Sequence, residues 1–306
     1  MERGHTIKVL DHGYVRLVDY MGSDESIVEA ARISTGRGFV SWKEYVRCKQ
    51  CDWYSTAPDG NEMRACPEHE NNLEEFPRGD HGILEYLYRM EHTSPFEMSE
   101  LIIDVMVPMD HWRQWIRNRT ANVNEYSTRY SEAINVVART QPTQWRSQGK
   151  TNRQGSGEFL DEAVGVVLSQ REIELHELAR KVYEERLTAG VAKEQARKDL
   201  PLSNYTAARW KIDLHNLLKH FLAKRLHSHA QAEIRAYARA VAKIVQSLWP
   251  RTYVLFDEYD LHGARLSCTE RMALHDLLRD GGDDGLLRQT LGEAGAKALI
   301  KKLGAL

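Results

Sequence analysis

Four short stretches of the chain have the apolar and β-branched pattern of β-strands. A turn with the sequence DHG separates the first two, and Pro108 ends the third because proline cannot donate to a strand ladder. The stretches are residues 6–10 (TIKVL), 14–22 (YVRLVDYMG), 99–109 (SELIIDVMVPM) and 205–213 (YTAARWKID).

Apolar residues spaced three and four positions apart predict helices over much of the remaining chain. The longest of these patterns ends at Gly190, and another long one ends at Pro250. The predicted helices cover residues 24–34, 81–92, 109–119, 158–190, 192–201, 214–226 and 228–249. Strands early and helices late in one chain predict an α+β domain.

Polar segments interrupt these patterns at residues 46–79 and 146–157. The first carries three of the four cysteines, and the second has the glycine and asparagine content of a loop. Residues 263–306 form a tail with two further helical patterns. We therefore expect a catalytic domain over residues 1–262, with the cysteine-bearing insert inside it, and a separate helical tail.

Composition and charge exclude several classes of function for this chain. The 306 residues include 42 Lys and Arg and 44 Asp and Glu, so no global charge drives binding to nucleic acid or an anionic membrane. The N-terminus lacks the apolar core of a signal peptide, and no apolar run approaches the roughly 18 residues of a membrane span. Four cysteines do not make a disulfide framework. We expect a cytoplasmic protein in which any anion binding is local.

Residues 113–131 form an unusually cationic segment, and residues 109–118 are expected to form a helix that includes its first half. In a helix, Arg113, Gln114 and Arg117 share one face because they lie three and four positions apart. The core side of that helix is then expected to hold Trp112, Trp115 and Ile116.

The second half of the segment, from Val123 to Tyr130, is predicted to be extended. That backbone would point Glu125, Ser127 and Arg129 to one side. Guanidinium groups bind phosphate through paired hydrogen bonds, and a carboxylate accepts from a ribose hydroxyl or an imide. The set favours a nucleotide ligand, with a solvated charged surface as the alternative.

The same segment resembles the signature of the flavin-dependent thymidylate synthases. That signature is Arg-His-Arg, seven residues and Ser, and here Arg117-Asn118-Arg119 precedes Ser127. Further blocks follow in the family order, and together they span about residues 5–260. They are EHTSPFE (91–97), NRQGSG (152–157), ARKDLPLSNYT (196–206) and KIDLHNLLKHFLAKRLHSHAQAEIRAYA (211–238).

The resemblance implies a fold in which a mixed or antiparallel sheet packs with long helices. It implies conversion of dUMP to dTMP, with methylenetetrahydrofolate as one-carbon donor, FAD as hydride carrier and NADPH as the reductant of the flavin. It also implies a homotetramer with active sites between subunits, and no nucleic-acid or membrane partner is expected. No cysteine lies in the matching blocks, which favours a mechanism without a cysteine nucleophile.

Residue by residue, the resemblance assigns two ligand sets. The dUMP set is Gln114, Ser127, Thr128, Arg129, Arg197 and Arg225. Arg225 is also the expected catalytic residue, because a fixed guanidinium against the pyrimidine stabilises charge on the ring carbonyl oxygens. The FAD set is His92, Ser94, Arg117, Asn118, Arg119, Glu125, His215, His220 and His229.

Three features depart from the family pattern. Asn118 stands for the central histidine of the signature and cannot take a proton near neutral pH. Thr128 stands for a glycine, which adds a side chain near the expected phosphate. The segment 217–225 (LLKHFLAKR) is one residue longer than usual, so Lys219 is an alternative to His220. These changes admit an alternative reaction, hydroxymethylation of dUMP, beside ordinary methylation.

Cys48, Cys51, Cys66 and His69 have the spacing of a zinc knuckle, with two close pairs joined by a longer loop. Four protein ligands leave no open position, so a structural zinc ion is expected rather than a catalytic one. A loop with unrelated thiols is the alternative. The insert also admits a function of another class, a zinc-stapled nucleic-acid-binding protein.

Overall fold

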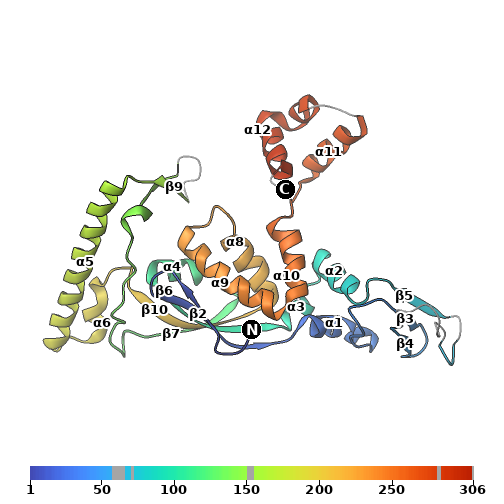
Figure 1. Cartoon of the computed structure of the whole chain (residues 1–306), viewed down its shortest axis with the longest axis horizontal. Helices are drawn as coiled ribbons and strands as arrows, with labels where there is room; N and C mark the ends of the chain where they lie inside the picture. Colours follow the sequence, from blue (N-terminus) through green and yellow to red (C-terminus); the bar gives the residue numbers. More distant parts are fainter. Residues whose placement is uncertain (57–65, 70–71, 150–154, 281–283, 305–306) are drawn as a thin grey trace. The chain divides into compact units, whose positions relative to one another are not determined.

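The computed structural model describes residues 1–56, 66–69, 72–149, 155–280 and 284–304. Its centre is a five-stranded antiparallel sheet with the strand order β1-β2-β6-β10-β7 (Figure 1). The strands are β1 (Thr6–Val9), β2 (Gly13–Met21), β6 (Glu100–Pro108), β7 (Ala121–Glu125) and β10 (Tyr205–Asp213). Four of them confirm the predicted strands, and the antiparallel sheet with its helices confirms the α+β fold.

One face of this sheet is buried. In β6, every second residue is fully buried, namely Leu101, Ile103, Val105 and Val107. On the opposite face, Asp104 accepts hydrogen bonds from Arg209 (2.8 Å) and Arg16 (2.6 Å), which join β10 and β2 to β6. These hydrogen bonds, from Arg209 first, hold the pKa of Asp104 below its ordinary value. The period of two therefore separates an apolar core face from a charged outer face.

Helix α9 (Ala232–Leu248) packs against β1, β2 and α4 (Met109–Trp115). The Tyr237 hydroxyl on α9 donates to the carbonyl of Met106 at 2.8 Å, and a Cβ at Gly13 would collide with that hydroxyl. Trp112 and Trp115 are buried as predicted. Ile116 is 42% exposed, so its predicted core position is wrong, because α4 ends one residue earlier.

Shorter helices follow the sheet strands. The side chain of Ser23 forms a capping box with Ser26 and starts α1 (Asp24–Arg32), which leads into the 3-10 turn η1 (Ile33–Thr35). Helices α2 (His81–Arg89) and α3 (Ser94–Glu97) precede β6. After β10 come α7 (Leu214–Asn216), the π-helix η4 (Leu217–Leu222) and α8 (Ala223–Arg225).

Residues 142–199 form a segment built on the long helix α5 (Glu162–Thr188), drawn in green in Figure 1. Beside it lie the 3-10 turn η2 (Pro142–Gln144), α6 (Lys193–Ala196) and the 3-10 turn η3 (Arg197–Asp199). The side chain of Asp161 accepts from the Ala163 amide at 2.8 Å and sets the start of α5.

The prediction of a loop over residues 146–157 is wrong for the residues at its two ends. Strands β8 (Arg146–Gln148) and β9 (Ser156–Phe159) pair there as a hairpin, while residues 150–154 lie outside the described part of the chain. Strand β9 also takes the first residues predicted for the long helix. Backbone pairing holds these short, polar strands together, so no apolar alternation marks them.

The insert contains a three-stranded antiparallel sheet in the order β4-β3-β5. Its strands are β3 (Tyr45–Cys48), β4 (Tyr54–Ser55) and β5 (Leu73–Phe76). At its base, Asp80 accepts from the Tyr45 hydroxyl at 2.6 Å and forms an ion pair with Arg32 at 2.6 Å. Burial, with the hydrogen bond to Asp80, raises the pKa of Tyr45 to about 12.

Val254–Leu306 forms a compact unit separate from Met1–Tyr253. The division falls within α10 (Pro250–Phe256), which the π-helix η5 (Asp257–Leu261) follows. Helices α11 (Cys268–Asp280) and α12 (Asp284–Gly304) supply a small core of Ala273, Leu287, Ala296 and Leu299. The boundary after residue 262 stays a prediction. Among the described helices, none combines the length and apolar composition that a membrane crossing needs.

Candidate active site

A cavity of about 500 Å³ lies where α4, the end of β7, the 3-10 turn η3 and the start of β10 meet. Six of its polar lining residues are two arginines, a lysine, a glutamate, a serine and a threonine. These residues are Arg113, Glu125, Ser127, Thr128, Arg197 and Lys198. Four of the six belong to the predicted ligand sets, and the size and charge of the cavity suit a phosphorylated small molecule.

The backbone of β7 positions the first part of this lining. Glu125 lies opposite Ala208 of β10, and the amide of Tyr126 donates to the Ala207 carbonyl at 2.8 Å. The side chain of Glu125 accepts from the Thr206 hydroxyl at 2.9 Å. Sheet register thus fixes the carboxylate at the edge of the cavity.

Strand β7 ends at Glu125 and residues 128–130 form a turn, so the extended backbone predicted from Val123 to Tyr130 is wrong for its last residues. The amides of Tyr130 and Ser131 donate to the Ser127 carbonyl at 3.3 and 3.0 Å, which makes a tight turn. Because the chain turns here, Arg129 is not among the residues that line the cavity. Its guanidinium lies 3.8 Å from Glu194, and both side chains are more than half exposed.

Thr128 and Arg197 are in direct contact inside the cavity. Nη1 of Arg197 donates to Oγ1 of Thr128 at 2.6 Å, across 69 residues of sequence. A charged donor makes this a strong hydrogen bond, and it holds the guanidinium in one orientation. The threonine that replaces the family glycine therefore orders a predicted phosphate ligand.

Gln114 and Arg225 form a second cluster. Nη2 of Arg225 donates to the Gln114 carbonyl at 2.7 Å, and the Gln114 side chain is hydrogen-bonded to Gln231. Nε of Arg225 is buried and has no hydrogen-bond partner within the described chain. Burial lowers the pKa of this guanidinium. Neither Gln114 nor Arg225 lines the 500 Å³ cavity. Within one chain, the predicted dUMP residues therefore lie in two separate places.

The predicted FAD residues are also dispersed. His92 and His215 line a small hollow of about 10 Å³ between α2 and the helix after β10, and burial lowers the pKa of His215. Arg117 and Arg119 follow α4 with exposed side chains, and Ser94 is exposed at the start of α3. Contrary to the prediction, α4 ends before Arg117, so a helix does not fix it on one face with Arg113. His229 is exposed, with its ring 4.6 Å from that of His227.

The π-helix η4 coincides with the segment that is one residue longer than the family pattern. A π-turn takes one extra residue without rotating the helix beyond it, so the apolar residues on both sides stay buried. Lys219 lines the hollow beside His92 and His215, with its ammonium 4.4 Å from the centre of the Tyr88 ring. His220 is exposed, with its ring 5.9 Å from that of His215. The geometry places Lys219, rather than His220, inside the hollow.

The family model described as "Thymidylate synthase complementing protein" matches residues 16–251. The chain belongs to the flavin-dependent thymidylate synthase family. It is 40% identical over 272 residues to the flavin-dependent thymidylate synthase of Wolbachia pipientis wMel, covering 89% of this chain and 83% of that protein. It is 42% identical over 279 residues to an enzyme of the same name from Thermus thermophilus, covering 91% of this chain and 88% of that protein.

Solved structures extend this likeness to the fold. A crystal structure of a UMP/dUMP methylase, PolB, from Streptomyces cacaoi bound with 5-Br UMP matches with a TM-score of 0.63. Its identity to this chain is 26%, and the match covers 83% of this chain and 98% of PolB. A second PolB structure, bound with 5-Br dUMP, matches with a TM-score of 0.60 and 27% identity over 82% of this chain and 96% of PolB. These matches support the flavin-dependent thymidylate synthase-like fold inferred from the sequence.

Asn118 has a structural role in this family member. Its side-chain amide donates to the Trp115 carbonyl at 2.7 Å, and its backbone amide donates to the same carbonyl at 3.1 Å. These bonds satisfy a carbonyl at the C-terminal end of α4 that the helix itself leaves free. Asparagine thus holds the turn that leads from α4 to Arg119 and carries no titratable group.

Sequence reasoning missed an ionic cluster around the buried His111 that joins α4, β8 and α9 in this thymidylate synthase family member. Nδ1 of His111 lies 2.8 Å from Asp110, Nε2 lies 3.9 Å from Glu233, and Arg146 pairs with Glu233. Against the opposing effect of burial, Asp110 and Glu233 raise the pKa of His111 to about 9. Against burial as well, His111 and Arg146 lower the pKa of Glu233 to about 2.

All four residues of this cluster line a second cavity, of about 610 Å³. Arg146 and Glu233 lie 87 residues apart in sequence. No local pattern connects such positions, so only the packing of α4 against α9 and β8 reveals the cluster.

Proposed function

We propose that this chain methylates dUMP to dTMP, with methylenetetrahydrofolate as one-carbon donor, FAD as hydride carrier and NADPH as the source of the reducing equivalents. The observation that carries the proposal is the 500 Å³ cavity, where Arg113, Arg197, Ser127 and Thr128 converge in a member of this family. The size suits a nucleoside monophosphate, and the donors suit its phosphate.

The residues of the chain have separate roles in this reaction. Arg197, held by Thr128, binds the phosphate with Ser127, and Glu125 accepts from a hydroxyl or imide of the nucleotide. Arg225 stabilises the negative charge that builds on a uracil carbonyl oxygen when C5 attacks the methylene carbon. Its buried Nε has no partner in the described chain, so a ligand oxygen would satisfy it.

The donor set also fits FAD. Arg117 and Arg119 are exposed cations suited to a pyrophosphate, and the exposed His92 lines the same hollow as the partly buried His215 and Lys219. When bound there, reduced flavin would supply the hydride that completes the methyl group, and the residues of the chain would position and polarise the substrates.

The division of the dUMP set supports a homotetramer as the active form. Arg225 and Gln114 lie in one cluster, and Ser127 and Arg197 lie in another, so two subunits together would complete a site. Helix α5 supports association because several of its apolar side chains are half or more exposed. These are Val164, Val166, Val167, Leu175 and Leu178. Such an apolar surface on a long helix is typical of a subunit interface.

A product assay separates methylation from hydroxymethylation. Purified protein is incubated with dUMP, methylenetetrahydrofolate, FAD and NADPH, and the product is identified by mass. We expect dTMP, and a product with one additional oxygen, 5-hydroxymethyl-dUMP, would contradict the proposal. A parallel incubation with UMP in place of dUMP measures whether this chain also accepts the ribonucleotide, because PolB is named a UMP/dUMP methylase.

The nucleic-acid-binding alternative predicts different behaviour. Such a protein would be colourless and would shift nucleic acid at physiological salt. Family membership supports the enzyme instead, and we expect purified protein to be yellow from bound flavin. Colourless protein with no product in the assay would contradict the proposal.

A further inference from the structure

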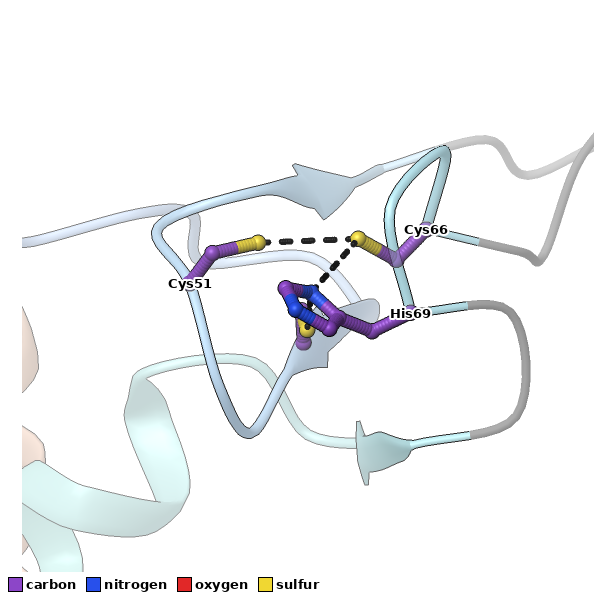
Figure 2. Close-up of side chains that lie close together, drawn as sticks. Cys51, Cys66 and His69 are labelled. Carbon is purple, nitrogen blue, oxygen red and sulfur yellow. Dashed lines mark hydrogen bonds between the residues drawn. The ribbon is translucent and has the colours of Figure 1, made fainter.

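The insert brings four metal-ligating side chains to one point. Cys48 ends β3, Cys51 lies in the turn after it, and Cys66 and His69 lie on a second turn before β5. One ligand atom from each residue, three sulfurs and a ring nitrogen, lies within 4.8 Å of all the others. Figure 2 shows the Cys51 and Cys66 sulfurs and the His69 ring directed toward one another.

Three of the six separations between ligand atoms are close to those of a tetrahedral zinc site. With Zn–S bonds of about 2.3 Å and a Zn–N bond of about 2.0 Å, tetrahedral angles require about 3.8 Å between sulfurs and about 3.5 Å between sulfur and nitrogen. The Sγ atoms of Cys51 and Cys66 lie 3.5 Å apart. Nδ1 of His69 lies 3.6 Å from Sγ of Cys48 and 3.8 Å from Sγ of Cys66.

The thiols are free, and two of the three are buried. Cys48 and Cys66 are 0% and 1% exposed, and Cys51 is partly exposed. A disulfide would need about 2.05 Å between sulfurs, so the 3.5 Å between Cys51 and Cys66 excludes one in this structure. The backbone amide of Gln50 points at Sγ of Cys48 at 3.4 Å, as expected for a donor that stabilises a thiolate.

The insert has almost no apolar core of its own. Of the described residues from 45 to 79, the buried ones are Tyr45, Arg47, Cys48, Cys66 and Gly79, and the Tyr45 ring stacks on Phe76 with 4.6 Å between ring centres. Apart from this one aromatic pair, strands of two and four residues have little apolar burial to hold them, because the other buried side chains are an arginine and two thiols. A bound ion would supply the missing free energy of folding, as in other small metal-stabilised segments.

We propose that Cys48, Cys51, Cys66 and His69 hold one Zn²⁺ in a closed structural site. Three thiolates and an imidazole at tetrahedral spacing favour zinc over the oxygen-loving Mg²⁺ and Ca²⁺. Four protein ligands leave no position for water or substrate, so the ion takes no part in methyl transfer.

The ion stabilises the insert at its distal end, and Asp80 holds the base. The carboxylate of Asp80 accepts from the amides of Val40 and Ser41 at 2.7 and 3.3 Å, as well as from Tyr45. Since Asp80 directly precedes α2, the zinc-stabilised sheet is connected to the helix that leads to His92.

Metal content of the full chain tests the proposal. Protein purified in buffers without added metal is analysed by elemental mass spectrometry, and we expect about one zinc ion per chain. Cys66→Ser and His69→Ala each lose the ion. The matched control is Cys268→Ser, which removes the exposed cysteine outside the cluster and keeps the zinc. Less than a tenth of an equivalent in the wild-type chain, or iron in place of zinc, would overturn the assignment.

A second measurement does not depend on variants that fold poorly. In Cys268→Ser protein, the three cysteines left are those of the cluster. Titration with a mercurial reagent, in the presence of a zinc-sensitive dye, should release the ion as these three thiols react. If all the zinc is released before any thiol reacts, the thiolates are not its ligands. The same conclusion follows if the zinc is still bound after all three thiols have reacted.

Discussion

At the scale of single residues, the two substitutions in the signature have different consequences. Asn118 replaces a titratable ring with an amide that closes the end of α4, bonded to the Trp115 carbonyl at 2.7 Å. Thr128 replaces a glycine with a hydroxyl that accepts from Arg197 at 2.6 Å. The first change affects the local fold, and the second affects a group that we assign to the substrate phosphate.

Thr128→Gly is therefore expected to weaken dUMP binding. Loss of the hydrogen bond to Arg197 removes about 1 kcal/mol, which corresponds to roughly a fivefold rise in KM for dUMP. Thr128→Ser keeps the hydroxyl and serves as the control, with KM close to that of the wild type. Steady-state kinetics over a range of dUMP concentrations checks both. A lower KM for the glycine variant would mean that Thr128 obstructs the phosphate rather than ordering Arg197.

At the scale of elements, the π-helix η4 explains how the chain accepts an additional residue. Leu217, Leu218, Phe221 and Leu222 are all buried around the widened turn. An α-helix of the same length would rotate everything after it by about 100° and expose part of this set. The widened turn keeps α8, and with it Arg225, in the orientation that a chain one residue shorter would have.

Deletion of Lys219 is predicted to convert η4 to an α-helix with little loss of stability. We expect a melting temperature within about 5 °C of the wild type, because the apolar residues on both sides keep their faces. The control deletes Ala242 from α9, a regular helix with buried residues on both sides of that position, and is expected to be far less stable. Thermal unfolding followed by circular dichroism compares the two. Equal destabilisation by both deletions would contradict the prediction.

The cluster of His111, Glu233 and Arg146 links three elements and gives stability a pH dependence. The folded-state pKa of His111, about 9, lies above its ordinary value of 6.5, so its contribution is complete below pH 6.5 and is lost as the pH rises through 9. The pKa of Glu233 is lowered from 4.5 to about 2, so its contribution is complete above pH 4.5 and is lost toward pH 2. The contributions of His111 and Glu233 together therefore favour the folded state most between about pH 4.5 and 6.5.

His111→Gln is expected to remove the loss of stability that the wild type shows as the pH rises above 6.5. In the wild type, the free energy of unfolding should fall by at most roughly 3 kcal/mol between pH 6.5 and 9, and in the variant that decline should be much smaller. Denaturant unfolding at several pH values measures the difference. His12→Gln, at an exposed histidine, is the control and should keep the wild-type slope. The same slope in all three proteins would show that His111 does not titrate in this way.

At the scale of the whole molecule, the separation of the two dUMP clusters predicts complementation between subunits. Arg225→Ala and Arg197→Ala should each be inactive alone, because each removes one side of every site. Mixed oligomers assembled at equal amounts should recover about a quarter of the wild-type rate, since roughly one site in four then combines both intact sides. Refolded mixtures assayed for dTMP test this. Rates that stay at the level of the separate variants would mean that both arginines act from the same chain.

The fold and many of the candidate site residues could be predicted from the sequence because their signals are local. Period-two and helical spacing located four of the five strands of the central sheet and the buried Trp112 and Trp115. The order of the arginine signature and later blocks indicated the family, which the comparisons confirm. The spacing of Cys48, Cys51, Cys66 and His69 predicted a cluster that the structure brings within 4.8 Å.

Tertiary structure decided everything that depends on contacts between distant residues. The turn at Ser127 directs Arg129 toward Glu194, and the pairing of Thr128 with Arg197 spans 69 residues. The division of the predicted dUMP residues into two clusters and the His111 cluster have no counterpart in any short pattern. Periodicity reports which face of one element is buried, whereas sheet register and helix packing decide which faces meet.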